Sequence, residues 1–217
     1  MSEEDLREEL RDPSIRADEA VTEWLTYVNS GRTDRAWRLL TTQAREHAGG
    51  YSGFVEWMKD PPSLHSELVE PPNATHESVV VIPGGRSDGS LVLVTLVRDK
   101  AALAIPVFVH PEGVARVQPF STRTVSLTRP AGPNDDLSCR PLFEAVVEGT
   151  RPQAAHFSVF VGGGEVESFE IEELAEDRYQ VAARIPHELS EGITAVSVLT
   201  IGPESMEADA SVFRVEY

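Results

Sequence analysis

The stretch VNSGRTDRAWRLLTTQAREH (residues 28–47) contains the end of one predicted helix and most of the next. Gly31 is suited to stop the first helix, because glycine readily adopts the left-handed conformation that follows a helix C-terminus. Thr33 is suited to cap the second helix, which Gly49 and Gly50 then end. The apolar residues of this second helix recur at helical spacing on one side: Ala36, Trp37, Leu40 and Ala44.

The first of these two helices begins upstream of the stretch, and a third helix is expected downstream. Upstream, Pro13 separates a loose lead-in (residues 1–13) from a helix that begins at Ser14. Downstream, Ser52 is suited to cap a short third helix, GFVEWMKD, and Pro61 and the proline after it forbid its continuation. The apolar face of the first helix has a period of three to four residues: Ala17, Val21, Trp24, Leu25 and Val28.

After the two prolines the hydrophobic period changes from about 3.6 to 2, which is typical of strands. The predicted strands are residues 63–70, 76–82, 90–97, 102–109 and 113–120. The stretch 90–97, SLVLVTLV, is apolar on both faces, so both must be covered. We expect the helices to cover one face and a second domain or subunit to cover part of the other.

Three sequence features together resemble the nuclear transport factor 2-like superfamily. They are the link N-S-G-R-x-D-x-A-W-x-L-L at residues 29–40, the helix motif F-x-x-W at 54–57, and the hairpin PVFVHPEGVARVQPF at 106–120. The resemblance covers residues 14–122 and implies an α+β cone, in which three helices pack against a curved antiparallel sheet. The closing motif here reads GVARV (113–117) and lacks the tryptophan usual in that family.

The remainder of the chain, residues 123–217, shows strand patterns without helical windows. A Pro-, Gly- and Asp-rich stretch at 122–138 contains either the domain boundary alone or the first strand of the next unit and its turn. Short alternating segments then follow one another, as in a β-sandwich. These segments are 139–149, 156–163, 166–174, 178–185, 193–201 and 207–217.

The segment DRYQVAARIPHELSEGITAVSVLTIG (177–202) resembles the late strands of bacterial immunoglobulin-like or fibronectin-type domains. This resemblance implies an all-β immunoglobulin-like sandwich over residues 123–217. The disulfide of antibody domains cannot form within this chain, because Cys139 is its only cysteine. Domains of this architecture usually space, pack or bind.

The charge of the chain excludes some classes of partner. The formal net charge is −17, and the excess of acid occurs in both halves, with 19 acidic and 12 basic residues in residues 1–122 and 17 acidic and 7 basic in residues 123–217. Neither half offers a basic surface for nucleic acid or anionic lipid. No run approaches the roughly 18 apolar residues of a membrane span. The N-terminus lacks a signal peptide, so the sequence as written predicts a cytoplasmic protein, or an extracytoplasmic one if an export signal was removed.

Aromatic residues of the first domain supply the candidate pocket. Placed beside a curved sheet, they would either line a pocket for a hydrophobic small molecule or form ordinary core, and we favour core. The six pocket-lining candidates are Trp24, Tyr27, Trp37, Phe54, Trp57 and Phe108.

No residue set predicts a catalytic centre, metal site or cofactor. The possible proton-transfer groups of the first domain are Tyr27, Asp34, His47, His65, His76 and His110. Asp34 suits the first turn of a helix and His47 the last, because each charge there opposes the helix dipole, and His110 fits a turn. The spacing of the histidines, including His156 and His187, matches no metal motif, and Cys139 is expected to be a structural thiol.

The sequence leaves three functional classes open. We favour a non-catalytic interaction or small-molecule-binding module, with a protein partner or self-association. The first alternative is a cone-fold isomerase or hydro-lyase acting on a hydrophobic small molecule, with Asp or His as general base. The second is an envelope-associated or adhesion protein whose anchor has been removed.

Overall fold

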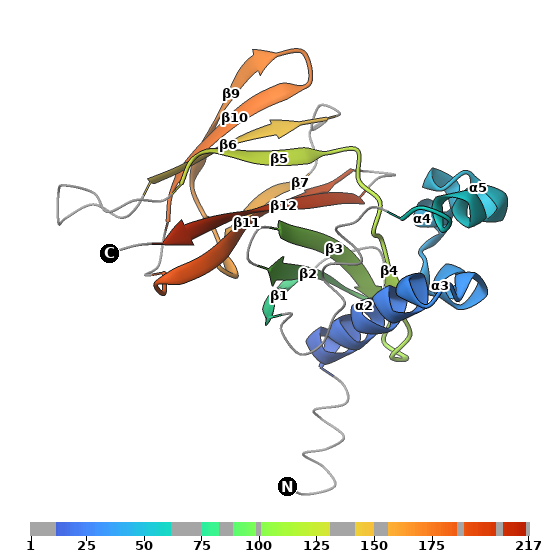
Figure 1. Ribbon diagram of the computed structural model, residues 1–217. Coiled ribbons are helices and arrows are strands. Elements are labelled where there is room, and N and C mark those ends of the chain that lie inside the picture. The colour runs from blue at the N-terminus through green and yellow to red at the C-terminus, as the bar shows by residue number, and fades with distance from the viewer. Residues whose placement is uncertain are drawn as a thin grey trace, which may run out of the picture. The chain divides into compact units, whose positions relative to one another are not determined.

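The computed structural model describes residues 12–61, 75–82, 89–98, 101–130, 142–149, 156–185, 189–202 and 206–215. The chain divides into two units, of which unit 1 comprises residues 1–94 and 105–120 and unit 2 comprises residues 95–104 and 121–217. The described elements are four helices and three four-stranded antiparallel sheets (Figure 1). The protein is therefore an α+β protein rich in β-structure.

The longest helix, α2 (Pro13–Asn29), confirms the first predicted helix. Its N-cap is Asp12, whose carboxylate accepts a hydrogen bond from the Ser14 amide at 2.9 Å, and Pro13 occupies the first turn, where a missing N–H costs nothing. Gly31 follows the helix with φ of 66° and ends it as expected. All five residues of the predicted apolar face are buried. The lead-in before Asp12 lies outside the described residues.

The predicted second helix is wrong as a single element, because the structure has two short helices in its place. These are α3 (Thr33–Leu39) and α4 (Thr42–His47). Leu40 is extended and bridges Val117, and the Thr41 amide donates to the Val117 carbonyl at 3.0 Å. The Thr41 amide, which would have bonded within a continuous helix, thus bonds to Val117 instead. Thr41, not Thr33, is the side-chain cap, and it accepts from the Ala44 amide at 3.0 Å.

The third helix, α5 (Gly50–Trp57), begins earlier than the sequence predicts. The expected cap Ser52 lies inside the helix. Gly49, with φ of 73°, stands between α4 and α5, and its amide donates to the Glu46 carbonyl at 2.9 Å. The left-handed turn at Gly49 lets α5 follow α4 almost directly. As expected, the helix ends before Pro61.

One sheet has the strand order β1-β2-β3-β4. Its strands are β1 (Thr75–Ile82), β2 (Ser90–Arg98), β3 (Ala101–Val109) and β4 (Ala115–Val117). β4 is shorter than the predicted strand 113–120, since residues 110–114 form the turn and Pro119 has no amide hydrogen for further pairing. The predicted strand 63–70 lies outside the described residues.

The apolar strand β2 is buried along its length, as its sequence predicts. Every residue from Leu91 to Val97 has at most 3% of its surface exposed. The end of β2 and the start of β3, residues 95–104, group with unit 2. There, the hydroxyl groups of Thr95 and Ser197 are 3.0 Å apart and share a buried hydrogen bond.

Unit 2 contains two sheets, with strand orders β5-β6-β10-β9 and β12-β11-β7-β8. The first comprises β5 (Thr124–Arg129), β6 (Leu142–Glu148), β10 (Arg178–Arg184) and β9 (Phe169–Ala175). The second comprises β12 (Met206–Val215), β11 (Gly192–Ile201), β7 (His156–Val161) and β8 (Gly164–Glu165). The proline-rich stretch thus includes a strand, β5, which was one of the two expectations for it.

Alternating residues of both sheets meet in one apolar core. Tyr179, Val181 and Ala183 of β10 are buried, while their neighbours in sequence are more exposed. β10 pairs with β6 so that Val181 faces Ala145 and Ala183 faces Phe143. The opposite sheet contributes Val159, Val196 and Phe213 to the same core. The period-2 pattern therefore identifies the faces of this core directly.

Candidate functional site

Four of the six candidate aromatic residues gather at the helical end of unit 1. Trp24 of α2 stacks on Trp57 of α5 with 6.2 Å between ring centroids, and Phe54 stacks on Trp57 at 5.6 Å. Phe120 meets Trp57 edge to face at 5.3 Å. Trp37 joins the group through Phe54, at 5.5 Å. We call these five residues the aromatic cluster.

The rings of the aromatic cluster are in contact with one another. Centroid separations of 4.5 to 7 Å are those of paired aromatic side chains, and every separation given above falls in this range. Trp24 and Phe54 are fully buried. The space between these rings is therefore filled by the rings themselves.

Trp37 lies at the outer side of the cluster and is only half-buried. Tyr51 of α5 meets its ring edge to face at 5.4 Å. On α4, the Arg45 guanidinium lies 5.3 Å from the centre of the same ring, and Arg45 Nε donates to the Trp37 carbonyl at 3.3 Å. A cation over an indole face is attracted by the π electrons. Trp37 thus presents a positioned ring at the surface.

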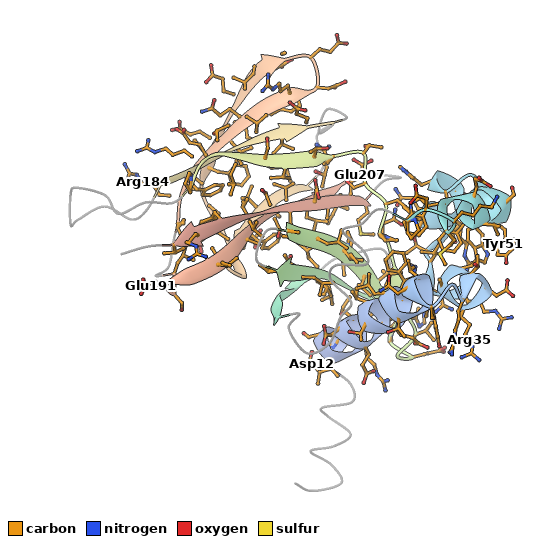
Figure 2. The ribbon with its side chains drawn as sticks, viewed as in Figure 1. Asp12, Arg35, Tyr51, Arg184, Glu191 and Glu207 are labelled. Atoms are coloured by element: carbon orange, nitrogen blue, oxygen red, sulfur yellow. The ribbon has the colours of Figure 1, made fainter. Side chains whose placement is uncertain are left out.

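Tyr51 connects this surface to a carboxylate. It is 43% exposed, and its hydroxyl donates a hydrogen bond to the Asp34 carboxylate in the first turn of α3. This hydrogen bond is the main reason that the pKa of Tyr51 lies above its ordinary value. Figure 2 shows Tyr51 at this helical end. We call Asp34, Trp37, Arg45 and Tyr51 the aromatic surface.

The other two candidates lie apart from the aromatic cluster. The Tyr27 hydroxyl donates to Glu23 on the same helix, and Arg35 lies over the Tyr27 ring at 5.6 Å. Phe108 of β3 lies over Gly89, where an added Cβ would come within 2.5 Å of the ring. The structure therefore assigns Tyr27 and Phe108 to separate local contacts.

The proton-transfer candidates that the structure describes make separate local contacts. The exposed imidazole of His47 stacks on Phe120 with a centroid separation of 5.8 Å, in the last turn of α4. His110 is exposed in a turn, where its Nδ1 accepts from the Glu112 amide at 3.4 Å. Asp34 is committed to Tyr51, as above. Five further residues that the sequence analysis considered lie outside the described residues or have no described side chain. They are His65, His76, Cys139, His156 and His187.

Within the described ranges, no group of three His, Cys, Asp or Glu side chains is placed to hold a metal ion. In the same part of the chain, every helix is too short or too polar to cross a bilayer.

Unit 2 contains a buried ion pair that the sequence pattern does not reveal. The side chain of Arg123 is 2% exposed, and its Nε lies 3.4 Å from Glu207 Oε2 at the start of β12. The Thr122 hydroxyl donates to the other oxygen of Glu207 at 2.8 Å. Burial lowers the pKa of Arg123, and the charge of Glu207 opposes this shift. The pair joins the start of β5 to β12.

Asp209 makes a second polar link between the same strands. Its two oxygens accept from the backbone amides of Val125, at 3.0 Å, and Ala210, at 2.9 Å. Burial raises the pKa of Asp209 above its ordinary value, while the two amides partly counteract this. An acidic residue in the alternating pattern of β12 is the only sequence signal for this link, and by itself it indicates a solvated face.

Sequence reasoning missed Tyr51, Arg45 and Phe120 as members of the helical end. Tyr51 precedes the predicted start of its helix. Phe120 was predicted as the last residue of the strand 113–120, whereas the structure ends β4 at Val117. Arg45 faces Trp37 only because the chain turns at Leu40. A scan against protein-family models gives no match for this chain, and a comparison with curated proteins gives none either.

Proposed function

We propose that the chain is a two-domain interaction module, with a nuclear transport factor 2-like cone followed by an immunoglobulin-like sandwich. For the first domain, the support is the order of elements, in which helices α2 to α5 precede the sheet β1-β2-β3-β4. The link at residues 29–40 lies where α2 passes into α3, as the resemblance implies.

Strand order supports the proposal for the second domain. In immunoglobulin domains one sheet has the order A-B-E-D and the other contains C-F-G. Lettered along the chain, with β8 as an additional strand after C, the sheet β5-β6-β10-β9 reads A-B-E-D and the sheet β12-β11-β7-β8 begins G-F-C. A shared core between the two sheets is also what a sandwich requires.

The proposed activity is binding of a protein partner through the aromatic surface. The observation that carries this proposal is the partly exposed Trp37 ring, held between Tyr51 and Arg45. Tryptophan, tyrosine and arginine are the residues most enriched at positions that dominate binding energy in protein interfaces. Here their side chains are already ordered by contact with one another, so less conformational entropy is lost on binding.

The alternative activities require a ligand inside unit 1. A cone-fold isomerase or hydro-lyase, or a binder of small hydrophobic molecules, would hold its ligand among the candidate aromatic residues. The ring contacts of Trp24, Phe54 and Trp57 favour surface binding over this arrangement, because Trp57 stacks on both of the other rings and Trp24 and Phe54 are fully buried.

A titration with phenol distinguishes binding at the aromatic surface from binding inside unit 1. Each of the three tryptophans gives its own indole N–H signal in an NMR spectrum, so the site of binding can be followed. Phenol is a probe for aromatic binding sites. We expect it to shift the indole signal of Trp37, which is half-buried at the aromatic surface, and to leave that of Trp24, which is fully buried, unchanged. A ligand inside unit 1 would instead move the Trp24 signal.

Two variants test the contribution of the surface itself. Tyr51→Ala removes one side of the aromatic contact and should weaken the phenol-induced shift of Trp37 severalfold. Val114→Ala is the matched control, since Val114 is also 43% exposed but lies in the β3–β4 turn. If phenol moves Trp24 first, or if both variants respond to phenol like the unaltered protein, the aromatic surface is not the binding site.

A further inference from the structure

The strand β9 lies at an edge of its sheet among the described strands. It pairs with β10 on one side, with Ile171 opposite Val181 and Phe169 opposite Ala183. Figure 1 shows β9 as the outer orange ribbon of that sheet. No described strand pairs with the side of β9 that points away from β10, so this side can receive a further strand.

The side chains of β9 are exposed to an unusual degree. All of its residues except Phe169 are exposed, and the apolar Ile171 and Leu174 are 46% and 43% exposed. Proteins commonly protect an edge strand by making it very short, with a bulge, or with proline or charged side chains. β9 has seven residues and neither proline nor lysine, and all of its charged side chains are acidic.

The charge on and around β9 is strongly negative. Residues 165–178 contain seven carboxylates and a single basic residue, Arg178, whose Nε lies 2.9 Å from Glu148 on β6. Two copies of this strand would bring like charges together across the ladder, which is destabilising. The same charge attracts a positively charged segment.

We propose that the edge of β9 binds an extended basic segment of another protein as an added strand. Successive side chains of a strand point to opposite faces, so Glu170, Glu172 and Leu174 lie on one face, and Phe169, Ile171 and Glu173 on the other. A segment of alternating basic and apolar residues therefore matches both faces over Phe169 to Glu172, whichever way it runs. Backbone hydrogen bonds supply affinity, and the alternation supplies specificity.

The proposal is independent of the aromatic surface in unit 1, so the failure of one leaves the other standing. The probe is the capped peptide Arg-Val-Arg-Val-Arg-Val-Arg, and its control is Arg-Arg-Val-Val-Val-Arg-Arg, which has equal charge and composition without alternation. Binding is measured by calorimetry at about 0.15 M ionic strength, where weak surface attraction is screened. We expect the alternating peptide to bind at least tenfold more tightly than the control.

Hydrogen exchange locates the bound peptide. Edge amides that lack a partner exchange quickly, and an added strand slows them. We expect the alternating peptide to slow exchange within Phe169–Ala175 and to leave α2 unchanged. Binding without protection in β9 would mean attraction by charge alone and would overturn the proposal.

A charge-reversal pair tests the specificity. Glu170→Lys with Glu172→Lys should weaken binding of the alternating peptide at least tenfold. The matched control is Glu46→Lys with Glu112→Lys, which makes the same change in net charge at exposed positions of unit 1 and should cost less than threefold.

Three results would overturn the proposal. The first is equal binding of the two peptides, the second is equal weakening by the two variant pairs, and the third is no binding of either peptide. Sedimentation of the protein alone supplies a further check. A dimer that the Glu170→Lys, Glu172→Lys pair abolishes would assign this edge to a second copy of the chain instead.

Discussion

Unit 1 packs its helical end with large rings, whereas unit 2 fills the space between its two sheets mainly with valine. The described core of unit 2 contains fifteen buried residues, of which nine are valine. β-Branched side chains are stiff and suit a pleated surface, so two facing sheets close over them. The rings of the aromatic cluster come from three helices and from the segment after β4, and Trp37 remains partly exposed.

This difference bears on where each unit can bind. The aromatic end is a core that continues to the surface, so the same rings that stabilise the helices are available to a partner. The valine core has no such continuation, and unit 2 instead exposes charged and apolar groups along the edge strand β9. Stability and proposed binding are thus combined in unit 1 and separated in unit 2.

The first prediction measures the aromatic core and has the largest expected effect. Trp24→Ala removes a fully buried ring and should lower the free energy of unfolding of unit 1 by about 3–5 kcal/mol. All three tryptophans lie in unit 1, so fluorescence of the remaining two during urea unfolding reports on that unit. Trp37→Ala, at the partly exposed ring, should lower the free energy of unfolding by less than half of this amount. Equal losses would show that the cluster has no distinct inner and outer side.

The second prediction concerns the buried charge of unit 2. Arg123→Met leaves the mostly buried Glu207 without its guanidinium and should destabilise unit 2 by about 3 kcal/mol, measured by far-ultraviolet circular dichroism in urea. Combining it with Glu207→Leu removes both charges and should restore most of the loss. A single variant as stable as the unaltered protein would mean that the pair does not hold β5 to β12.

The third prediction tests the break between α3 and α4. Thr41→Ala removes the cap of α4 and the hydrogen bond that Thr41 donates to the buried side chain of Gln118, so unit 1 should lose about 1–2 kcal/mol. Thr42→Ala is the control, because Thr42 is exposed and begins the helix without capping it. Similar effects of the two changes, followed by tryptophan fluorescence, would argue against a capping role for Thr41.

The fourth prediction is a change in pH dependence and has the smallest expected effect. Because the pKa of Asp209 is higher in the folded protein than in the unfolded chain, the native state binds more protons between these two values. This group therefore makes unit 2 more stable as pH falls toward and through its folded pKa. Asp209→Asn should remove this contribution. The difference in urea midpoint between the two proteins, measured from pH 7 to pH 3, should therefore change in favour of the unaltered protein as pH falls. A difference that stays constant with pH would show that burial does not raise this pKa.

Local pattern alone predicted several elements. The period of α2 and its stop at Gly31, and the alternation of β10, follow from side-chain spacing and from the conformational freedom of glycine. The burial of both faces of β2 follows from its unbroken apolar sequence. Four candidate ring residues also come together as members of one site, because helical periodicity places them on inward faces.

The division of the second helix was beyond sequence pattern. Its apolar residues keep a helical period through Leu40, and nothing nearby in the sequence signals a break. The break arises because the Val117 carbonyl, far along the chain, accepts from the Thr41 amide. Arg45 reaches Trp37 and Tyr51 reaches Asp34 only across this break.

The sequence by itself determined most of the helical and extended segments and which of their faces are apolar, since both depend mainly on neighbours within a few positions. Only the tertiary structure decided which rings meet, which carboxylate pairs with Arg123, and which strand lies at an edge. These features depend on contacts between residues that are distant in the chain, such as the 84 positions between Arg123 and Glu207. Periodicity shows that a face will be buried, but a specific partner exists only once the chain has folded.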